Sequence, residues 1–126
     1  MTERTRLPNR RLGETREIEF IRSDGKVVAY EATVGFNPTG APKEIFLLGA
    51  KDGSDMAAVL SDTAVALSVA LQHGVSARAM AASIARRPIE LDGPPIRAAS
   101  IVGAALDLLA EYEPVSAEMA LVRPVP

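Results

Sequence analysis

The chain has 126 residues, of which 48% are apolar and 24% charged, so it is long enough to form one domain with its own core. A net charge of −2 indicates no general attraction to nucleic acid or to an anionic membrane. The sequence contains no cysteine and one histidine, His73. This composition excludes disulfides, thiolate metal sites, cysteine nucleophiles and a zinc site built from several histidines.

The first 13 residues predict a flexible basic arm. The segment contains four arginines and one acidic residue, Glu3, and Pro8 and Gly13 interrupt any periodicity. Such an arm would touch phosphate or an acidic partner, or it would be a solvated tail. No apolar segment follows Met1, which argues against a signal peptide, and the apolar stretch 56–71 is too polar and too short to span a bilayer. We therefore expect a cytoplasmic protein.

The next segment predicts a three-stranded antiparallel meander. Alternation of apolar and polar residues over 14–22 and 27–36 is typical of half-buried strands. The Asp-Gly pair at 24–25 favours a tight hairpin turn, and the Asn-Pro-Thr-Gly run at 37–40 favours a second turn. A third strand over 43–49 carries apolar residues on both faces, so we expect it to be the most buried of the three.

A long helix is predicted over 55–73, with Ser54 as its N-cap and Gly74 at its end. Val65 and Val69 lie outside its main apolar stripe, so the helix is apolar over most of its circumference. We therefore expect it to be central, with the sheet on one side and the other helices on the other.

The remaining pattern predicts a shorter helix over 77–85, a loop over 89–95 and a last helix over 97–112. A proline-containing tail covers 113–126. The predicted fold is α+β, with a single domain over 14–112. A three-stranded antiparallel meander packs on a central long helix plus two further helices.

The residues suggest one weak anion site. The turn that contains Lys51, Gly53 and Ser54 precedes a helix N-terminus, where backbone N–H groups and a lysine can hold a phosphate. The alternative is an ordinary strand-to-helix connection with Ser54 as cap. Arg97 and the arginine pair at 86–87 bracket the 89–95 loop, where they would either complete an anion patch or act as capping charges on a solvated rim.

The other titratable residues point to no defined chemistry. Glu17, Glu19 and Glu31 are expected to face one another on an exposed sheet face, which is a poor place for acid–base catalysis. His73 lies in the last turn of the long helix, where interaction with the helix dipole is the simpler explanation. We predict no catalytic residue, no metal ligand and no cofactor. A small enzyme would instead need a pocket lined by several of the residues Glu17, Glu31, Asp52, Asp62, Arg97 and His73.

Three pieces follow one another in the run from Val34 to Gly74 and just beyond it: a Lys-Glu-Ile-Phe-Leu strand at 43–47, a Gly-Ala-Lys-Asp-Gly-Ser turn at 49–54 and a helix ending in His-Gly-Val at 73–75. In this order and spacing they resemble the TSCPD domain. This domain occurs at the C-terminus of adenosylcobalamin-dependent ribonucleotide reductases and as a small stand-alone protein. The resemblance extends over residues 17–110.

The chain also departs from this family. Where the family has its Thr-Ser-Cys-Pro-Asp run, residues 96–100 read Ile-Arg-Ala-Ala-Ser, and the cysteine expected near Pro88 is missing as well. The resemblance thus implies the fold and a link to ribonucleotide reduction, but no redox or metal role. The reductase chemistry that the family label implies needs a cysteine radical, which this chain cannot supply alone.

The resemblance implies a non-catalytic accessory or binding domain. Such a domain would dock to a ribonucleotide reductase or another larger nucleotide enzyme, or would bind an anionic ligand such as a nucleotide. A second hypothesis is a self-associating module, most simply a dimer, because the long helix, the third strand and the tail are apolar. The third hypothesis is a small stand-alone enzyme that uses carboxylates and arginines.

Overall fold

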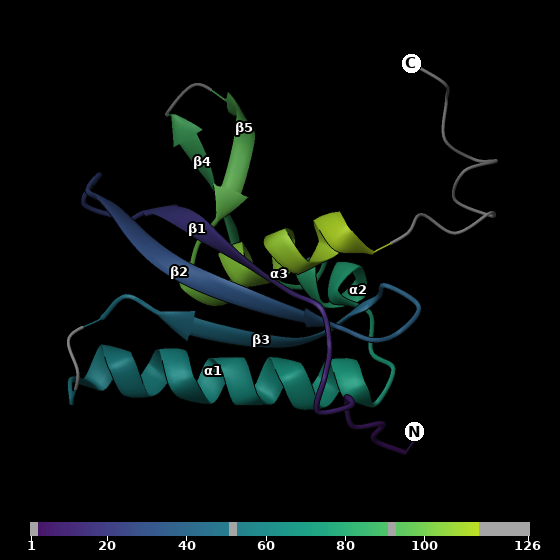
Figure 1. Ribbon diagram of the computed structural model, residues 1–126. Coiled ribbons are helices and arrows are strands. Elements are labelled where there is room, and N and C mark those ends of the chain that lie inside the picture. The colour runs from purple at the N-terminus through teal and green to yellow at the C-terminus, as the bar shows by residue number, and fades with distance from the viewer. Residues whose placement is uncertain (1–2, 51–52, 91–92, 114–126) are drawn as a thin grey trace, which may run out of the picture.

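The computed structural model describes residues 3–50, 53–90 and 93–113. Figure 1 shows a sheet of three antiparallel strands in the order β1-β2-β3, three helices and a separate two-stranded hairpin. The sheet strands are β1 (Gly13–Ile21), β2 (Val27–Phe36) and β3 (Pro42–Leu48). The helices are α1 (Asp55–Gln72), α2 (Ala77–Ala81) and α3 (Ile101–Tyr112), and the hairpin strands are β4 (Arg86–Glu90) and β5 (Gly93–Ala98). The predicted α+β fold with a three-stranded meander and one long helix is confirmed.

The two sheet turns form where the sequence predicts them. Gly25 and Gly40 adopt φ angles of +86° and +87°, which side chains with a Cβ rarely allow. The side chain of Asn37 closes the second turn by accepting hydrogen bonds from the backbone N–H groups of Thr39, at 3.1 Å, and Ala41, at 2.9 Å. Strand pairing is therefore set locally, by residues within each turn.

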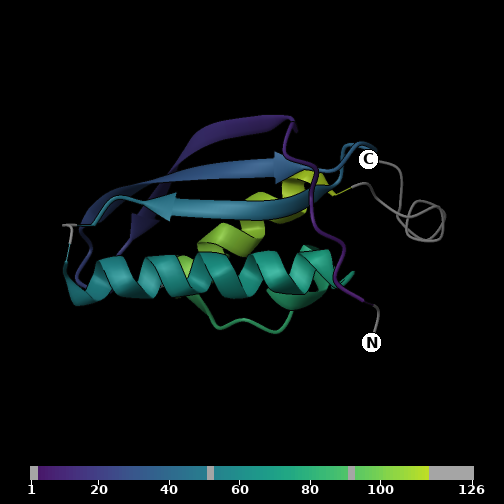
Figure 2. The same cartoon turned by 60° about the horizontal axis from the view of Figure 1, so that its bottom comes forward.

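One face of the sheet forms the core, and α1 and α3 both lie on that side (Figure 2). Alternation along the strands sends every second side chain inward, as predicted for β1 and β2. The buried strand residues are Ile18, Tyr30, Ala32, Val34, Ile45 and Leu47. The helices add mainly leucine and alanine: Leu60, Ala64, Leu67, Leu71, Ala105, Leu106, Leu108 and Leu109.

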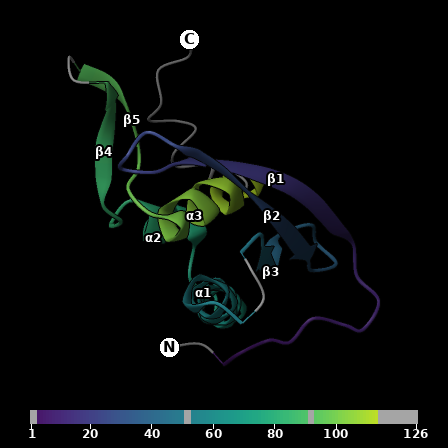
Figure 3. The same cartoon turned by 90° about the vertical axis from the view of Figure 1, so that its left-hand side faces the viewer.

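The third strand is covered on one face only, although its apolar residues lie on both faces. β3 is an edge strand, and its outward side chains Phe46 and Leu48 are 51% and 63% exposed. The long helix is also less enclosed than expected, since Val65 is 60% exposed. Both helices lie on one face of a small sheet, so no described element covers the outer side of α1 or the opposite face of β3 (Figure 3).

In the segment predicted as a loop over 89–95, residues 89–90 and 93–95 instead belong to the β4–β5 hairpin, which projects from the body in Figure 1, and residues 91–92 lie outside the described residues. The prolines of this segment indicated an irregular connection. In a two-stranded hairpin, however, residues whose N–H groups point away from the partner strand make no hydrogen bond between the strands, so proline is tolerated there. The last helix consequently begins at Ile101, not near 97, with Ser100 as its N-cap. The short helix α2 ends at Ala81, because the chain then turns into β4.

Glu113 fixes α2 against α3. Its carboxylate accepts hydrogen bonds from the backbone N–H groups of Ala77, at 2.7 Å, and Arg78, at 3.0 Å, and from the Ser76 hydroxyl, at 2.9 Å. In return, the Arg78 side chain donates to the backbone oxygen of Ala110 at 2.8 Å. An anion at a helix N-terminus and a cation at a helix C-terminus are both favoured by the helix dipoles.

α1 has the length and apolar composition of a membrane-crossing helix, contrary to the expectation from the 56–71 stretch. In the fold, one side of α1 is buried against the sheet and the core through Leu60, Leu67 and Leu71. A core helix of a soluble protein passes the same test of length and composition.

The Glu113 cap predicts a large effect on stability. We expect Glu113→Ala to lower the free energy of unfolding by about 1–2 kcal/mol, because three donors at the start of α2 lose their acceptor. Urea unfolding followed by circular dichroism measures the change. The matched control is Glu111→Ala, which removes only an exposed ion pair with Arg16 and should change stability by less than about 0.5 kcal/mol. Equal effects of the two substitutions would contradict the capping role.

Candidate functional site

Of the residues in the predicted anion site, Gly53 and Ser54 lie at the start of α1 and Arg97 lies in β5. Lys51 lies outside the described residues. Gly53 forms the turn before α1 with φ +77°, and the Ser54 hydroxyl accepts a hydrogen bond from the N–H of Ala57 at 3.1 Å, as an N-cap does. Arg97 lies in β5 and lines a different groove, described next. The anion site remains a prediction, and the described contacts of Ser54 are those of a helix cap.

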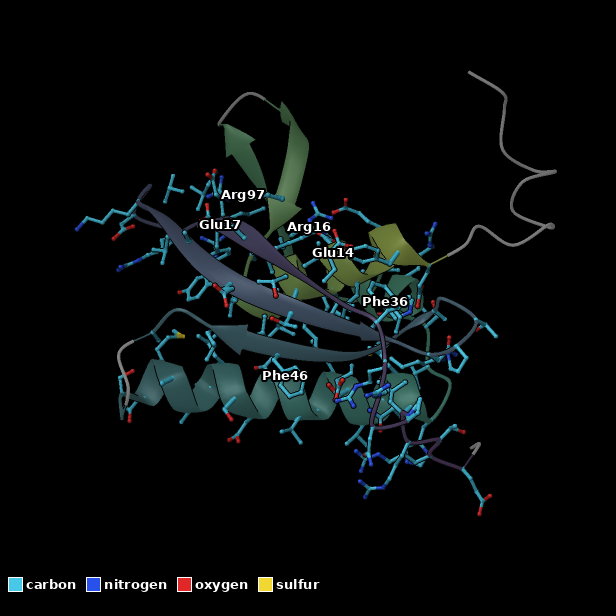
Figure 4. All side chains as sticks on the ribbon, in the orientation of Figure 1. Glu14, Arg16, Glu17, Phe36, Phe46 and Arg97 are labelled. Atoms are coloured by element: carbon cyan, nitrogen blue, oxygen red, sulfur yellow. The ribbon has the colours of Figure 1, made fainter. Side chains whose placement is uncertain are left out.

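A charged groove of about 350 Å³ lies between β1, β5 and α3. Figure 4 shows Arg16, Glu17 and Arg97 around it. The other charged residues that line it are Glu19, Asp107 and Glu111. Charges of both signs line this groove, which gives it no strong preference for an anion.

Several of these charges hold elements together. The Arg16 guanidinium lies 5.8 Å above the ring of Tyr112, and it donates to the Tyr112 hydroxyl at 3.5 Å and to Glu111 at 3.4 Å. The hydrogen bond to Tyr112 and the charge of Glu111 raise the pKa of Arg16. Tyr112 in turn packs edge-on against Phe36 with ring centres 5.1 Å apart. Arg16 thus connects β1 to α3.

The arginine pair at 86–87 has a similar structural use. Arg86 donates two hydrogen bonds to the Asp107 carboxylate, at 2.6 and 2.7 Å, and the bond to Asp107 raises the pKa of Arg86. Arg86 also donates to the backbone oxygen of Ala81 at the end of α2, and Arg87 donates to the backbone oxygen of Ala99. These contacts tie the β4–β5 hairpin to α2 and α3.

The carboxylates predicted on the open sheet face lie there. Glu17 of β1 is directly opposite Glu31 of β2, and Glu19 is opposite Ala29, all of them exposed. Direct opposition of like charges destabilises a strand pair. The third hypothesis needs a pocket lined by several of Glu17, Glu31, Asp52, Asp62, Arg97 and His73. Glu17 and Arg97 both line the charged groove, whereas Asp62 is exposed on α1, His73 is the C-cap residue of α1 and Asp52 lies outside the described residues. Within the described residues, no group of three metal-ligating side chains could hold a metal ion.

A second groove, of about 490 Å³, lies between β3 and α1. Phe46 marks its position in Figure 4. Its walls are mostly apolar or small side chains: Phe46, Leu47, Leu48, Ala57, Leu60, Ser61, Ala64 and Val65. At one end it is closed by polar contacts that the sequence analysis did not predict.

Two buried polar residues of α1 bind the edge of β3. The Ser68 hydroxyl accepts from the N–H of Ile45 at 2.9 Å and donates to the oxygen of the same residue at 3.2 Å. The Gln72 side chain donates to the backbone oxygen of Lys43 at 3.1 Å and accepts from Arg4 at 2.7 Å. The signal in the sequence is a serine and a glutamine four residues apart within an apolar stripe, which places both on one side of the helix.

Comparison with known proteins gives one relationship. Over 72 residues the chain is 35% identical to the vitamin B12-dependent ribonucleotide reductase of Rhodopirellula baltica. That stretch is 57% of this chain and 6% of the enzyme, so the chain spans a small fraction of the relative that it matches. No protein-family model matches the chain, and no solved structure matches it. The chain is therefore related to a segment of this reductase.

The Ser68 contacts predict a specific loss. We expect Ser68→Ala to lower the free energy of unfolding by about 2 kcal/mol, because the N–H and C=O of Ile45 would be buried without a partner. Hydrogen exchange should show faster exchange of the Ile45 amide, and urea unfolding gives the stability change. Ser61→Ala, on the same helix but exposed, is the control and should change stability by less than about 0.5 kcal/mol. An unchanged Ile45 exchange rate would refute the assignment.

Proposed function

We propose that this chain is a non-catalytic accessory module that docks to a ribonucleotide reductase or to another large nucleotide enzyme in the cytoplasm. The similarity to a segment of the vitamin B12-dependent reductase supports this proposal most directly. The similar stretch makes up over half of this chain but a small part of the enzyme, as expected for a module shared between them.

The shared segment is, in this proposal, the TSCPD domain. The order of its pieces supports this assignment: β3, a glycine-containing turn, and a long helix that ends before Gly74. The chain contains no cysteine, so it offers no thiol for radical or reducing chemistry. Its contribution to a nucleotide enzyme would then be binding, with the chemistry carried by the partner.

The open face of the sheet is the surface best suited to docking. No described helix covers it, and Glu17 and Glu31 oppose each other there without forming an ion pair to another of the described residues. A pair of like charges costs stability in the free chain, and a basic partner surface would remove that cost. The proposed partner surface is therefore rich in lysine or arginine.

The test is binding of the purified chain to the cobalamin-dependent ribonucleotide reductase of its own organism, measured by calorimetry at several salt concentrations. We expect the double substitution Glu17→Gln with Glu31→Gln to weaken binding by about tenfold or more and to reduce its dependence on salt. The same double variant should unfold at slightly higher urea concentration, since it loses like-charge repulsion of about 0.5 kcal/mol.

The control is Glu14→Gln, because Glu14 is an exposed carboxylate of the same strand whose position in the alternation places it on the other side of the sheet. It should bind as the parent chain does. If the chain did not bind the reductase at all, the docking proposal would be wrong. Binding that is equal for all variants would show that the open face is not the surface used.

A further inference from the structure

Residues 3–12 cross the ends of β2, β3 and α1 (Figure 1 and Figure 2). At the α1 end, the backbone N–H of Thr5 donates to the backbone oxygen of Gln72 at 2.7 Å. At the sheet end, the backbone oxygen of Leu12 accepts a hydrogen bond from the N–H of Phe36 at 2.9 Å. We call residues 3–12 the N-terminal strap, because the segment is bound at both of its ends.

Between these two contacts, Arg11 of the strap forms a two-bond ion pair with Glu44 of β3. Its Nε and Nη2 donate to the two carboxylate oxygens at 2.6 and 2.8 Å, and the Arg11 and Glu44 side chains are only 28% and 15% exposed. The alternation of β3 places Glu44 on the open face of the sheet, opposite Gly35 of β2. A Cβ atom at Gly35 would lie 2.5 Å from Oε2 of Glu44, so the glycine leaves the space in which the carboxylate lies.

Glu44 lies on the same face of the sheet as Glu17 and Glu31. Leu48 is directly opposite Glu31, and Glu44 is four residues before Leu48, which is about 13 Å along the strand. Phe46 and Leu48 point to this face between the carboxylates and are 51% and 63% exposed. The open face therefore has carboxylates on both sides of an apolar centre. Glu44 differs from Glu17 and Glu31, because a cation of the same chain already binds it.

A basic partner that binds this face meets a competitor at Glu44. Both oxygens of the carboxylate already accept hydrogen bonds from Arg11, so a guanidinium of the partner can form the same two bonds only after Arg11 leaves. Ion pairs near the surface contribute little to stability, so this pair can open while the chain stays folded.

We propose that the N-terminal strap is an autoinhibitory contact, in which Arg11 occupies Glu44 in the free chain and a basic partner displaces it on docking. This inference rests on the proposed function, because it concerns the same open face. The partner segment carries basic residues on both sides of an apolar one, which contacts Phe46 and Leu48. The strap lowers the apparent affinity for this partner, because only chains with Glu44 free are competent to bind it fully.

The displacement is tested by NMR on the full chain with hexa-arginine as the probe. The Nε–H of Arg11 donates to Glu44, so its exchange with water should be slow in the free chain. Saturating hexa-arginine should accelerate this exchange about fivefold or more, whereas the Phe36 amide, which binds Leu12, should keep its rate. If hexa-arginine did not bind, or bound without changing the Arg11 exchange, the proposal would be wrong.

Affinity for hexa-arginine, measured by calorimetry, separates competition from a passive strap. We expect Arg11→Gln to lower the dissociation constant about three- to tenfold, because it leaves Glu44 free. The matched control is Arg10→Gln, which changes the net charge equally at the neighbouring exposed residue and should lower the dissociation constant less than about twofold. Both positions lie on the strap, so both variants should keep the circular dichroism spectrum of the parent chain.

Glu44→Gln breaks the same ion pair but also removes the carboxylate. It should therefore bind hexa-arginine no more tightly than the parent chain does. Equal tightening by Arg11→Gln and Glu44→Gln would show that the strap only obstructs the face. Equal affinities of Arg11→Gln and Arg10→Gln would show that Arg11 does not compete with the probe. Either result would overturn the proposal.

Binding to the cobalamin-dependent ribonucleotide reductase of the same organism distinguishes this proposal from the proposed function. We expect Arg11→Gln to bind the reductase more tightly than Arg10→Gln does. If the hexa-arginine results were as expected and the reductase did not bind, the proposed function would be wrong and the competition at Glu44 would stand. If the reductase bound both variants equally, docking would stand and autoinhibition by the strap would be wrong.

Discussion

The attachment of α1 to the edge of β3 organises the rest of the structure. Ser68 and Gln72 replace the neighbouring strand that the outward groups of Ile45 and Lys43 lack, and both side chains are buried. A buried peptide group without a partner is costly, so these bonds set the position of the helix along the strand. With that register set, Leu60, Leu67 and Leu71 of α1 enter the core beneath the sheet.

The same row of helix residues continues beyond these polar contacts. It changes from hydrogen-bonding side chains at Ser68 and Gln72 to Ala64, and from there the strand edge borders an apolar groove. One element, α1, therefore provides both the polar contacts to β3 and one wall of the groove.

The charged residues of this chain mostly connect elements. Arg16 joins β1 to α3, Arg86 joins the β4–β5 hairpin to α3, and Glu113 joins α3 to α2. Glu17 and Glu31 differ, because they oppose each other on an open face and neither forms an ion pair within the described residues. For this reason we place the proposed docking surface at these two carboxylates. Docking also agrees with the relation of this chain to a segment of a much larger enzyme.

The sequence by itself determined the local features: the three sheet strands, the two turns with Gly25 and Gly40, the cap Ser54, and the long helix. These features depend on the conformational preferences of residues that lie within a few positions of one another in the sequence. Only the tertiary structure decided that β3 is an edge, that Val65 stays exposed and that the proline-containing segment pairs as a hairpin. Those outcomes depend on which element covers which face, and periodicity shows that a side chain is apolar but not what packs against it.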